Sequence, residues 1–538
     1  MTVRTRPGNA RHAERDGKFL PSHWVLFMRA AVGRRLRGVM AVARGSKDTS
    51  ILLHSNTEPA PLPPIESLKM PPVRPTGSGH TTFGYENLAF EGGGAKGYAY
   101  IGAVRVLEEE GIYPHNIRRV TGTSIGSMFA MFASLGVSSA FMEERIPADI
   151  ESLAKDGSGG PLAGFMRAAR RKGMNPGQRL YGFLGEILEE VTGSADITFA
   201  QLYERCGREL AIPVTNVTRM MTEFCHIKTT PNMAVRVATR MSMSLPVLLQ
   251  PVSLQSVYDR ITGDSNAELY VDGGLLCNNP THVFDGWWLS MDPRDSFLRR
   301  LQPLDHASAF YPRSARFSPS NPRTLGFTLF AGEETDITRG WLVPGAEPPA
   351  RPDTPAAREF AEEEKERKRQ SGMQKPVQRL LTRLDEHDVN SDGRISKEEL
   401  AATLSDGSFS TEDTTLIFGT TDVDDIFDHM NADGGDSIEF TELLSYLESR
   451  GLDLTTSLVG FPARPPKNIL EFAMNMLEAV TRDLTRSNQT VDDRPRTVPI
   501  NTDYIGTTTF NLETADLKWM IESGRKHTKA FLDAHRGS

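Results

Sequence analysis

The feature that most constrains this chain is a pair of glycine-rich turns, each of which follows a short apolar run and precedes a helical pattern. The first turn, Gly92–Gly97, follows the run 87–91, and apolar residues then recur at helical spacing up to Leu107. The second turn, 121–127, follows the run 117–120 and precedes an apolar helix. Each turn therefore connects a predicted buried strand to a predicted helix.

The first turn presents free backbone N–H groups at the N-terminus of a helix, which suits a bound anion or an oxyanion. Its glycine spacing also fits a dinucleotide-binding pattern. That pattern expects an acidic residue about 20 positions further on, at the end of the next strand. Here Glu108–Glu110 fall at the end of the predicted helix instead, and no Gly-Lys-Ser/Thr completes a Walker A loop. Nucleotide binding is therefore the weaker interpretation.

The second turn contains the pattern of a nucleophile elbow, Gly122-x-Ser124-x-Gly126, in which flanking glycines relieve a sharp turn and expose the serine hydroxyl. The alternative is a Gly/Ser turn of no chemical meaning. A serine hydroxyl also needs a base to become a nucleophile. The late histidines are poor candidates, because His429 lies in an acidic loop region and His527 in a polar terminal helix.

A carboxylate is the other choice of base. The strand-like run 269–271 leads directly into Asp272-Gly273-Gly274. An aspartate at the end of a strand can reach a neighbouring elbow, although an ordinary Asp-Gly turn is the other interpretation of this dipeptide.

These three motifs, in this order, resemble those of patatin-like phospholipases, which carry Gly-Gly-Gly-x-Arg/Lys-Gly, Gly-x-Ser-x-Gly and Asp-Gly-Gly/Ala. Here they are Gly92–Gly97, Gly122–Gly126 and Asp272–Gly274. The resemblance implies an α/β fold, a three-layer α/β/α hydrolase with a central, mostly parallel sheet. It also implies Ser124 as nucleophile and Asp272 as base, with no catalytic histidine.

The resemblance further implies an oxyanion hole made by backbone donors of the first turn. The implied residues are Gly92, Gly93, Gly94, Ala95, Lys96 and Gly97. Lys96 stands where many members of the family carry arginine, so a cation remains but its bidentate fork is lost. We expect residues 141–200 to line or cover an acyl channel, from their place in the chain and their apolar pattern.

Residues 388–399 indicate a different chemistry, because they fit a 12-residue EF-hand calcium loop throughout. Gly393 provides the turn at position 6, and Ile395 at position 8 is expected to pair with a sister loop. Apolar residues from Val377 to Leu384 repeat as an entering helix should. The alternative is an acidic helix–turn–helix. The predicted calcium ligands are Asp388, Asn390, Asp392, the carbonyl of Arg394, and Glu399.

A second loop, residues 431–442, has suitable flanking helices but an incomplete set of ligands. Position 5 is Gly435, which has no side-chain oxygen, and position 6 is Asp436 in place of the glycine that the turn needs. We expect weak or no calcium binding in this loop, which would still complete a paired EF-hand fold. The remaining candidate ligands are Asn431, Asp433, Ser437 and Glu442.

Charge is distributed unevenly along the chain. Residues 1–48 hold eleven Lys or Arg and three Asp or Glu, whereas the other residues hold 50 and 66. The acidic body argues against general nucleic-acid binding. The acid-free segment 17–47 is open to three interpretations: a disordered head, an organelle-targeting presequence or a membrane-surface helix. Three cysteines in 538 residues exclude a disulfide scaffold and a four-cysteine zinc site.

Proline-rich stretches and changes of pattern divide the chain into five predicted segments. They are a disordered basic head with a proline-rich linker, a catalytic domain, a linker with a charged helix, an EF-hand pair inserted into the hydrolase, and the C-terminal part of the catalytic domain. Their bounds are 1–83, 84–331, 332–374, 375–452 and 462–538.

We therefore expect a carboxylic ester hydrolase of the phospholipase or acylglycerol lipase type, which releases fatty acids from membrane or storage lipids. Calcium would regulate or stabilise it through the EF-hands without entering the chemistry. The expected partners are a lipid substrate and a membrane or lipid-droplet surface, and the expected location is intracellular with peripheral membrane association. The alternative is a catalytically silent, calcium-responsive membrane adaptor on the same fold. Lipid class and oligomeric state stay open.

Overall fold

The computed structural model describes most of the chain after residue 51, and every described residue falls within the unit Leu52–Ser538. The predictions for the basic head, residues 1–48, lie outside the described residues. None of the described helices is long and apolar enough to cross a membrane. The described ranges are 52–53, 61–68, 70, 72–76, 83–158, 160–254, 267–302, 308–331, 340–370, 374–387, 393–405, 409–450, 466, 469–509 and 511–536.

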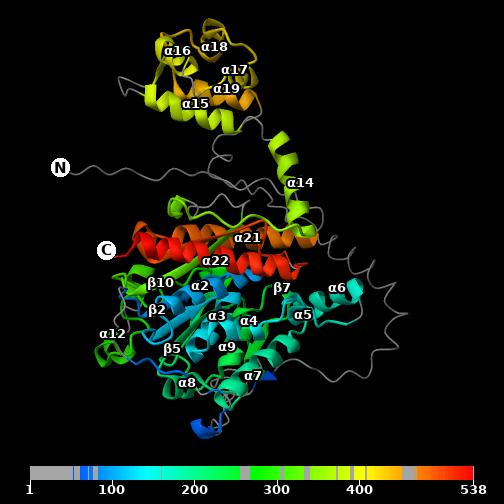
Figure 1. Ribbon diagram of the computed structural model, residues 1–538, viewed down its shortest axis with the longest axis vertical. Coiled ribbons are helices and arrows are strands. Elements are labelled where there is room, and N and C mark those ends of the chain that lie inside the picture. The colour runs from blue at the N-terminus through cyan, green and yellow to red at the C-terminus, as the bar shows by residue number, and fades with distance from the viewer. Residues whose placement is uncertain are drawn as a thin grey trace, which may run out of the picture. The chain divides into compact units, whose positions relative to one another are not determined.

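A mixed, mostly parallel sheet forms the centre of this unit (Figure 1). Its order in the described residues is β1-β8-β9-β5-β3-β2-β10-β13, with β6 paired to β5. Strands β5, β3, β2, β10 and β13 are parallel neighbours, whereas β6 and β9 run antiparallel to β5. The bounds are β1 Leu52–Leu53, β2 Asn87–Phe90, β3 Arg119–Gly122, β5 Glu209–Asn216, β6 Met221–Cys225, β8 Val252–Leu254, β9 Glu268–Val271, β10 Thr324–Ala331 and β13 Thr497–Asp503.

Both faces of the sheet are covered, as successive side chains of β5 demonstrate. Leu210 and Ile212 belong to the main apolar core, whereas Ala211, between them, belongs to a second cluster with Phe224 and Phe284. Successive side chains of a strand point to opposite faces, so the sheet separates two apolar layers. The predicted three-layer α/β/α fold is confirmed.

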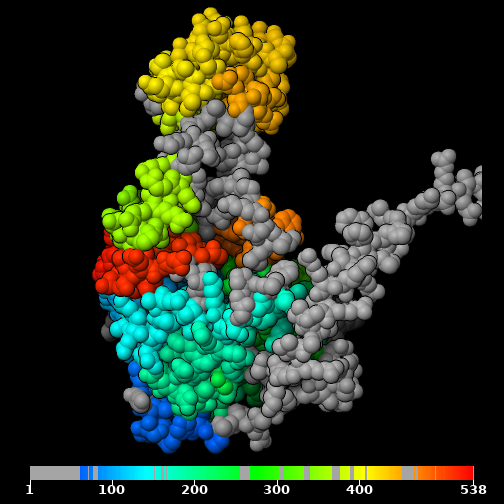
Figure 2. Space-filling view, turned by 90° about the vertical axis from the view of Figure 1, so that its right-hand side faces the viewer, coloured from blue at the N-terminus to red at the C-terminus, as the bar shows by residue number. Residues whose placement is uncertain are grey.

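The helices α2 (Ala99–Glu109) and α22 (Thr514–Ala534) pack unusually closely because glycines face the partner backbone. A Cβ atom at Gly102 would lie 1.8 Å from the carbonyl oxygen of Ile521, and one at Gly524 would lie 1.9 Å from that of Ala99. In the space-filling view of Figure 2, α22 is the red band across the surface. The last helix of the chain is thereby fixed against the first helix of the catalytic unit.

Further elements surround this core. Strands β4 (Gly173–Asn175) and β7 (Val247–Leu249) form a separate parallel pair. The other helices of this part are α3 Ile125–Leu135, α4 Ser139–Arg145, α5 Glu151–Ala154, α6 Gly160–Arg171, α7 Gln178–Thr192, α8 Phe199–Cys206, α9 Val235–Ser242, α11 Gly274–Cys277, α12 Phe297–Arg300 and α13 Arg313–Arg316, with short 3-10 helices η1 Ile65–Ser67, η2 Gly94–Tyr98, η3 Pro293–Asp295 and η6 Val491–Arg496.

Described residues of the segment before residue 84, which contains the predicted proline-rich linker, contact the domain. Leu52 and Leu53 pair in parallel with Ser253 and Leu254 of β8. Further along, Arg205 donates to the carbonyl of Pro63 at 2.6 Å. Proline-rich chain can be ordered in this way, because its carbonyls remain free to accept hydrogen bonds from arginines of the domain.

Strands β10 and β13 pair in parallel from Gly326 with Thr497 to Ala331 with Asp503, with a shift of register after Phe330, although more than 160 residues separate them in sequence. The chain therefore leaves the sheet after β10 and returns to the adjacent position at β13. In the sequence between these two strands are α14 (Pro355–Gln370), a helical module, and α21 (Ile469–Asn488).

The helical module has an apolar core of its own, which includes Leu380, Leu400, Phe427 and Leu447. Its two short strands pair antiparallel, with Ile395 opposite Ile438, the contact that the sequence predicts between sister loops. Its elements are α15 Gln374–His387, β11 Ile395–Ser396, α16 Lys397–Ser405, α17 Thr411–Phe418, α18 Val423–Met430, β12 Ser437–Ile438 and α19 Phe440–Ser449.

Candidate active site

Ser124 occupies a strained turn between β3 and α3. Its φ of 51° and ψ of −127° lie outside the regions that L-residues favour. Two glycines make this turn sterically feasible: a Cβ at Gly122 would lie 2.0 Å from the carbonyl oxygen of Gly126, and one at Gly126 would lie 2.4 Å from that of Phe90. The Gly-x-Ser-x-Gly pattern thus has the geometry of a nucleophile elbow.

The Ser124 hydroxyl donates a hydrogen bond of 2.6 Å to Oδ2 of Asp272, which follows β9. The second carboxylate oxygen, Oδ1, accepts from the N–H of Gly274 at 2.7 Å. The Asp272 backbone is fixed as well, because its N–H donates to the carbonyl of Ser244 at 3.0 Å and its carbonyl accepts from the Thr215 hydroxyl at 2.9 Å. The two residues that the motifs single out are therefore in direct contact.

Burial raises the pKa of Asp272 to about 7, and the hydrogen bonds from Ser124 and Gly274 only partly oppose that rise. A carboxyl group with a pKa near neutrality changes its protonation state easily at physiological pH. The side chain can therefore accept a proton from a hydroxyl and return it in a later step.

Ser242, at the end of α9, connects the elbow to the aspartate turn, although no motif singles it out. Its hydroxyl oxygen accepts from the N–H of Ser124 at 3.0 Å and donates to the carbonyl of Pro213 at 2.7 Å. Its own carbonyl accepts from the N–H of Gly273 at 3.3 Å. The residue is fully buried, so its contacts orient the serine from behind.

The six residues of the first glycine turn separate into different roles. Three of their amides have backbone acceptors: Gly92 donates to the carbonyl of Asn278, Ala95 to that of Thr507, and Lys96 to that of Gly93. Gly97 packs against α3, since a Cβ there would lie 2.7 Å from a side-chain carbon of Ile125. Within the described residues, the amides of Gly93 and Gly94 donate to no acceptor, and both residues line the same cavity as Ser124.

The Lys96 side chain lines the same cavity as Ser124 and is hydrogen-bonded to the protein. It is 4% exposed, and its ammonium donates to the carbonyl of Leu329 in β10 at 3.1 Å. This cation therefore joins the glycine turn to the sheet.

Glu91, immediately before the turn, is a buried carboxylate that sequence analysis does not single out. Its Oε2 accepts from the N–H of Leu329 at 3.0 Å and from the hydroxyl of Thr328. Its Oε1 accepts from the side-chain amide of Asn278 at 3.1 Å, and the same amide donates to the carbonyl of Gly92 at 3.2 Å. Glu91 thereby connects the glycine turn, strand β10 and the segment after Asp272.

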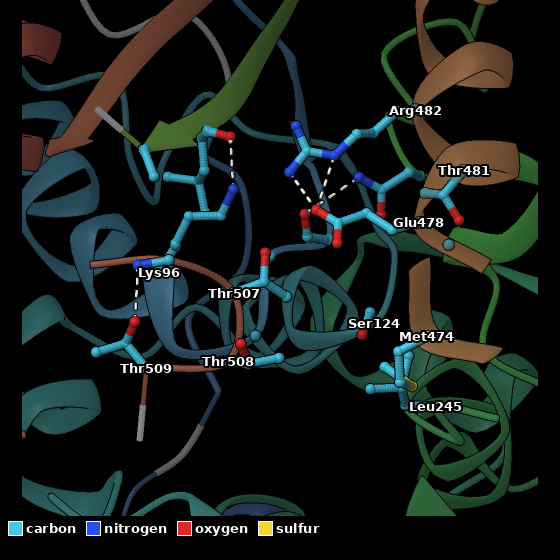
Figure 3. A pocket seen from close by; sticks show the side chains of 18 of the residues that line it. Lys96, Ser124, Leu245, Met474, Glu478, Thr481, Arg482, Thr507, Thr508 and Thr509 are labelled. Atoms are coloured by element: carbon cyan, nitrogen blue, oxygen red, sulfur yellow. Dashed lines mark hydrogen bonds and ion pairs between the residues drawn. The ribbon is translucent and has the colours of Figure 1, made fainter. Parts of the chain in front are cut away.

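A cavity of about 670 Å³ opens in front of these groups (Figure 3). Ser124, Asp272 and the glycine turn form one wall, and helices α14 and α21 contribute others. In the view of Figure 3, Ser124, Leu245 and Met474 lie toward one end of the cavity, and Lys96 lies toward the other. The apolar lining residues are Leu245, Pro246, Leu275, Leu329, Ala331, Pro355, Ala356, Phe360, Met474 and Leu477.

The predicted acyl-channel segment, residues 141–200, is not part of this wall: the lining residues of the described cavity include none from it. Leu180 and Leu184 are instead buried in the main core, where α7 packs. The two late histidines also lie elsewhere, with His527 bonded to Ser523 inside α22 and His429 to the backbone of α18. Neither is among the lining residues of the described cavity.

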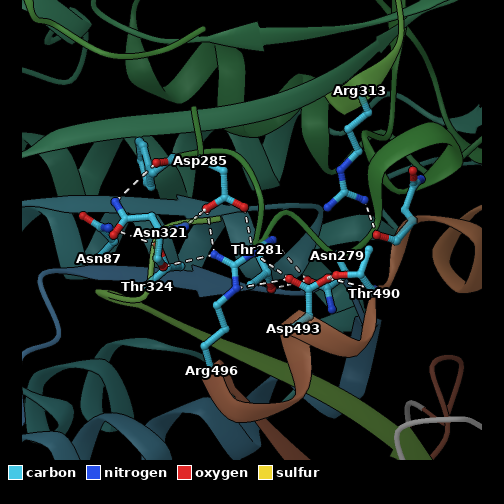
Figure 4. A network of polar contacts seen from close by, with 12 residues as sticks. Asn87, Asn279, Thr281, Asp285, Arg313, Asn321, Thr324, Thr490, Asp493 and Arg496 are labelled. Atoms are coloured by element: carbon cyan, nitrogen blue, oxygen red, sulfur yellow. Dashed lines mark hydrogen bonds and ion pairs between the residues drawn. The ribbon is translucent and has the colours of Figure 1, made fainter. Parts of the chain in front are cut away.

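A buried charge network fixes the chain just after α21 (Figure 4). Arg496 of η6 donates to both carboxylate oxygens of Asp285 at 2.7 Å and to Asp493 at 2.6 Å. All three side chains are at least nine-tenths buried. Just before η6, the carbonyl of Asn488, the last residue of α21, accepts a hydrogen bond from Arg313. The C-terminal end of a cavity-lining helix is thus anchored to the catalytic unit.

The first predicted calcium loop is described only in its second half, since Asp388, Asn390 and Asp392 lie outside the described residues. Gly393 has a φ of +71°, the left-handed conformation that the turn at position 6 requires. At position 12, Glu399 accepts from the N–H and hydroxyl of Ser396 at 2.9 and 2.8 Å.

In the second loop, the candidate ligands Asn431 and Glu442 form hydrogen bonds with backbone groups. Glu442 accepts from the N–H groups of Ala432, Asp433 and Glu439, and Asn431 exchanges hydrogen bonds with Gly435. The left-handed glycine is Gly434 at position 4, with a φ of +72°. Within the described residues, no group of three or more His, Cys, Asp or Glu is placed to hold a metal ion.

The mixed sheet, the strained serine turn and the adjacent aspartate together form one α/β catalytic site. Residues 88–285 match the family model described as patatin-like phospholipase. This range contains the glycine turn, the elbow and the aspartate turn, and it ends before α14 and α21.

Curated relatives match a similar length of the chain. "Uncharacterized protein R571" of Acanthamoeba polyphaga mimivirus is 29% identical over 201 residues, 37% of this chain and 61% of the relative. "Probable lipid hydrolase 463L" of Invertebrate iridescent virus 6 is 22% identical over 206 residues, 37% of this chain and 63% of the relative. The chain thus spans about three-fifths of the length of these two relatives.

Two solved structures are more distantly similar. VipD from Legionella pneumophila is 15% identical, with a TM-score of 0.35, and the match covers 84% of this chain and 67% of that one. ExoU from Pseudomonas aeruginosa, solved with SpcU, is also 15% identical, with a TM-score of 0.22 and coverage of 78% and 87%.

Proposed function

We propose that this chain is a serine acyl hydrolase that releases fatty acids from lipids, with Ser124 as nucleophile and Asp272 as base. The observation that carries the proposal is the 2.6 Å hydrogen bond from the Ser124 hydroxyl to Asp272, at the wall of a cavity with both apolar and charged lining residues. The family match over residues 88–285 and the name of one relative, a probable lipid hydrolase, support the same chemistry.

In the first half of the reaction, Asp272 accepts the Ser124 proton as the serine oxygen attacks the ester carbonyl. The carbonyl oxygen becomes an oxyanion, for which the free amides of Gly93 and Gly94 are the donors. As the carbon–oxygen ester bond breaks, Asp272 returns the proton to the departing alkoxide. The products are an alcohol and an acyl group on Ser124.

In the second half, a water molecule attacks the acyl group and Asp272 accepts its proton. The ester to Ser124 then breaks, and the proton goes to the serine oxygen, which releases the free fatty acid. A raised carboxyl pKa suits this cycle, because the group must take up and give back a proton twice. Removal of the base should lower the rate of hydrolysis by a factor of about 10²–10⁴.

The cavity favours a substrate with a hydrocarbon chain. Apolar side chains such as Leu245 and Met474 line it, together with charged side chains of α14 and α21, and its volume is in the range of sites that hold drug-sized molecules. The ammonium of Lys96 already donates to a backbone carbonyl without a phosphate group. We therefore propose membrane or storage lipids as the substrate class, met at the surface of a membrane or droplet inside the cell.

Calcium control is a further part of the proposal. The first loop supports it with the left-handed Gly393, the pairing of Ile395 with Ile438, and Glu399 at position 12. Oxygen atoms of this loop would coordinate a bound calcium ion, with Glu399 as the ligand from α16. In the second loop the incomplete ligand set supports at most weak binding.

Two measurements test the hydrolase proposal together: labelling by a fluorophosphonate, and fatty-acid release from phosphatidylcholine vesicles and triacylglycerol emulsion. We expect both in the wild type and neither in Ser124→Ala. The matched control is Ser134→Ala, which removes a hydroxyl from α3, the helix that follows Ser124. Ser134 does not line the cavity, so this variant should retain activity. An unlabelled, inactive wild type that still binds vesicles in response to calcium would favour the silent adaptor.

A further inference from the structure

Helix α21 presents apolar side chains on two opposite sides. Its inner side contributes Met474 and Leu477 to the wall of the cavity, together with Glu478, Thr481, Arg482, Thr485 and Arg486. Large apolar side chains that gather on an exposed face, in addition to those on the inner side, are typical of a surface that meets a protein or a membrane. Burial of the apolar side chains on the outer side of this helix against a partner surface would therefore be favourable.

The outer side carries a stripe of three large apolar residues at intervals of four: Phe472, Met476 and Val480. They are 49%, 57% and 47% exposed, and Ala479 lies exposed beside them. Four-residue spacing places them one above another on one face of the helix. In Figure 2 the orange atoms of this helix reach the surface next to the red band of α22. We call these three residues the α21 stripe.

The charges around the stripe indicate what kind of surface it can meet. Its exposed charged neighbours on the helix are Glu471 and Asp483, and both are acidic. Arg482 is directed toward the cavity side, where its Nε donates to Glu478 at 2.8 Å. An acidic rim disfavours an anionic surface, so contact must come from apolar burial rather than from charge attraction.

The location of the stripe indicates how it would serve the catalytic site. The same helix separates it from the cavity that contains Ser124, so a lipid beside the stripe has one helix to pass. Because the proposed substrates are insoluble, they reach the enzyme from an aggregate, and this inference rests on the proposed function. A second copy of the chain would bury the stripe equally well, but it would also cover the wall of the cavity.

We propose that the α21 stripe is a docking surface for an electrically neutral lipid surface, such as a zwitterionic bilayer or a droplet. The helix lies against the interface with Phe472, Met476 and Val480 in contact with lipid. Its inner residues then receive the acyl chain into the cavity.

The test uses the full chain and vesicles of pure phosphatidylcholine, which exclude charge attraction by the basic N-terminal segment. Flotation measures binding of the wild type, of Phe472→Gln/Met476→Gln and of Phe472→Leu/Met476→Leu. Both substitutions keep good helix formers, and only the first removes the apolar surface. The matched control is Leu298→Gln on α12, which changes a residue that is 79% exposed elsewhere in the chain.

We expect the glutamine variant to lose at least about tenfold in vesicle binding and in release of fatty acid from vesicles. The leucine variant and Leu298→Gln should stay within about twofold of wild type. Hydrolysis of a soluble short-chain ester should stay within about twofold in every variant, which reports that the site and fold are intact.

Equal flotation of the wild type and the glutamine variant would overturn the proposal. So would a wild-type dimer that the glutamine variant loses in the absence of lipid, since a second copy would then be the occupant. If flotation depends on the stripe while no ester is hydrolysed, the docking surface stands and the proposed hydrolase function fails.

Discussion

The hydroxyl of Ser124 and the carboxylate of Asp272 are joined by a 2.6 Å hydrogen bond across 148 positions of sequence. Two strand ends produce this contact, since Ser124 follows β3 and Asp272 follows β9. Strand β5 lies between them in the sheet, with Thr121 opposite Ala211 and Val271 opposite Thr215. Hydrogen bonding of the strands therefore determines the distance between nucleophile and base.

The first prediction concerns the pH dependence of hydrolysis. Asp272 must be ionised to accept a proton, and burial raises its pKa to about 7. With a soluble ester, kcat/KM should rise about tenfold per pH unit below that value and level off above it. Measurement between pH 5 and 9 tests this. A rate that already levels off at pH 5 would exclude Asp272 as the titrating base.

The second prediction concerns stability. In the unfolded chain the Asp272 pKa is about 3.9, so its folded pKa is raised and the folded state keeps the proton to higher pH. Its contribution to stability is complete below about pH 4 and is lost as pH rises to about 7. Asp272→Asn should therefore match wild type near pH 4 and be more stable at pH 8 by about 2–4 kcal/mol. Urea unfolding at both pH values measures the difference.

The third prediction concerns Glu91, a positioning residue for the glycine turn. Either orientation of a glutamine side chain would direct its NH₂ group at the N–H of Leu329 or at the amide of Asn278. Glu91→Gln should lower kcat by about tenfold to a hundredfold with little change in KM, because a displaced turn weakens the oxyanion donors.

The control for Glu91→Gln is Glu86→Gln, which changes an acid near the start of the same strand that is paired at the surface with Arg323. Its kcat should stay within about twofold of wild type. If the two variants lose kcat equally, Glu91 has no special part in holding the turn.

Parts of this site could be predicted from sequence because they are local. Gly122, Ser124 and Gly126 lie within five consecutive positions, so one short pattern reports the turn, although Gly126 also leaves room for the carbonyl of Phe90 in β2. Ser242 and Glu91 could not be predicted, because their roles arise from partners such as Ser124, 118 positions away from Ser242. A buried serine or glutamate in an apolar segment carries no periodic signal of such a contact.

The walls of the cavity could not be predicted for a similar reason. The apolar pattern of residues 141–200 indicates burial, but it does not distinguish core packing from a cavity lining, and Leu184 is in the core. Helix α21 follows the helical module in sequence and reaches Ser124 only because β13 returns beside β10. That return is a property of the sheet order, to which the local sequence of α21 contributes nothing.

The fourth prediction concerns the buried network after α21. Arg496→Met would leave Asp285 and Asp493 buried without their cation, so it should destabilise the protein by about 3–5 kcal/mol. Arg323→Met, which breaks a surface pair, should cost less than about 1 kcal/mol. Urea unfolding compares the two variants. Equal costs would mean that the network does not anchor the chain.

The final prediction concerns calcium stoichiometry. Position 12 supplies a bidentate ligand in an EF-hand, so Glu399→Gln should abolish tight binding. Glu442→Gln should change it by less than about threefold, because in the second loop this carboxylate bonds backbone N–H groups and the ligand set is incomplete. Isothermal titration of the chelator-treated protein should find one tight equivalent per chain in the wild type and in Glu442→Gln. Two tight equivalents would show that the second loop binds calcium as well as the first. One equivalent that Glu442→Gln removes would show that the second loop binds in place of the first.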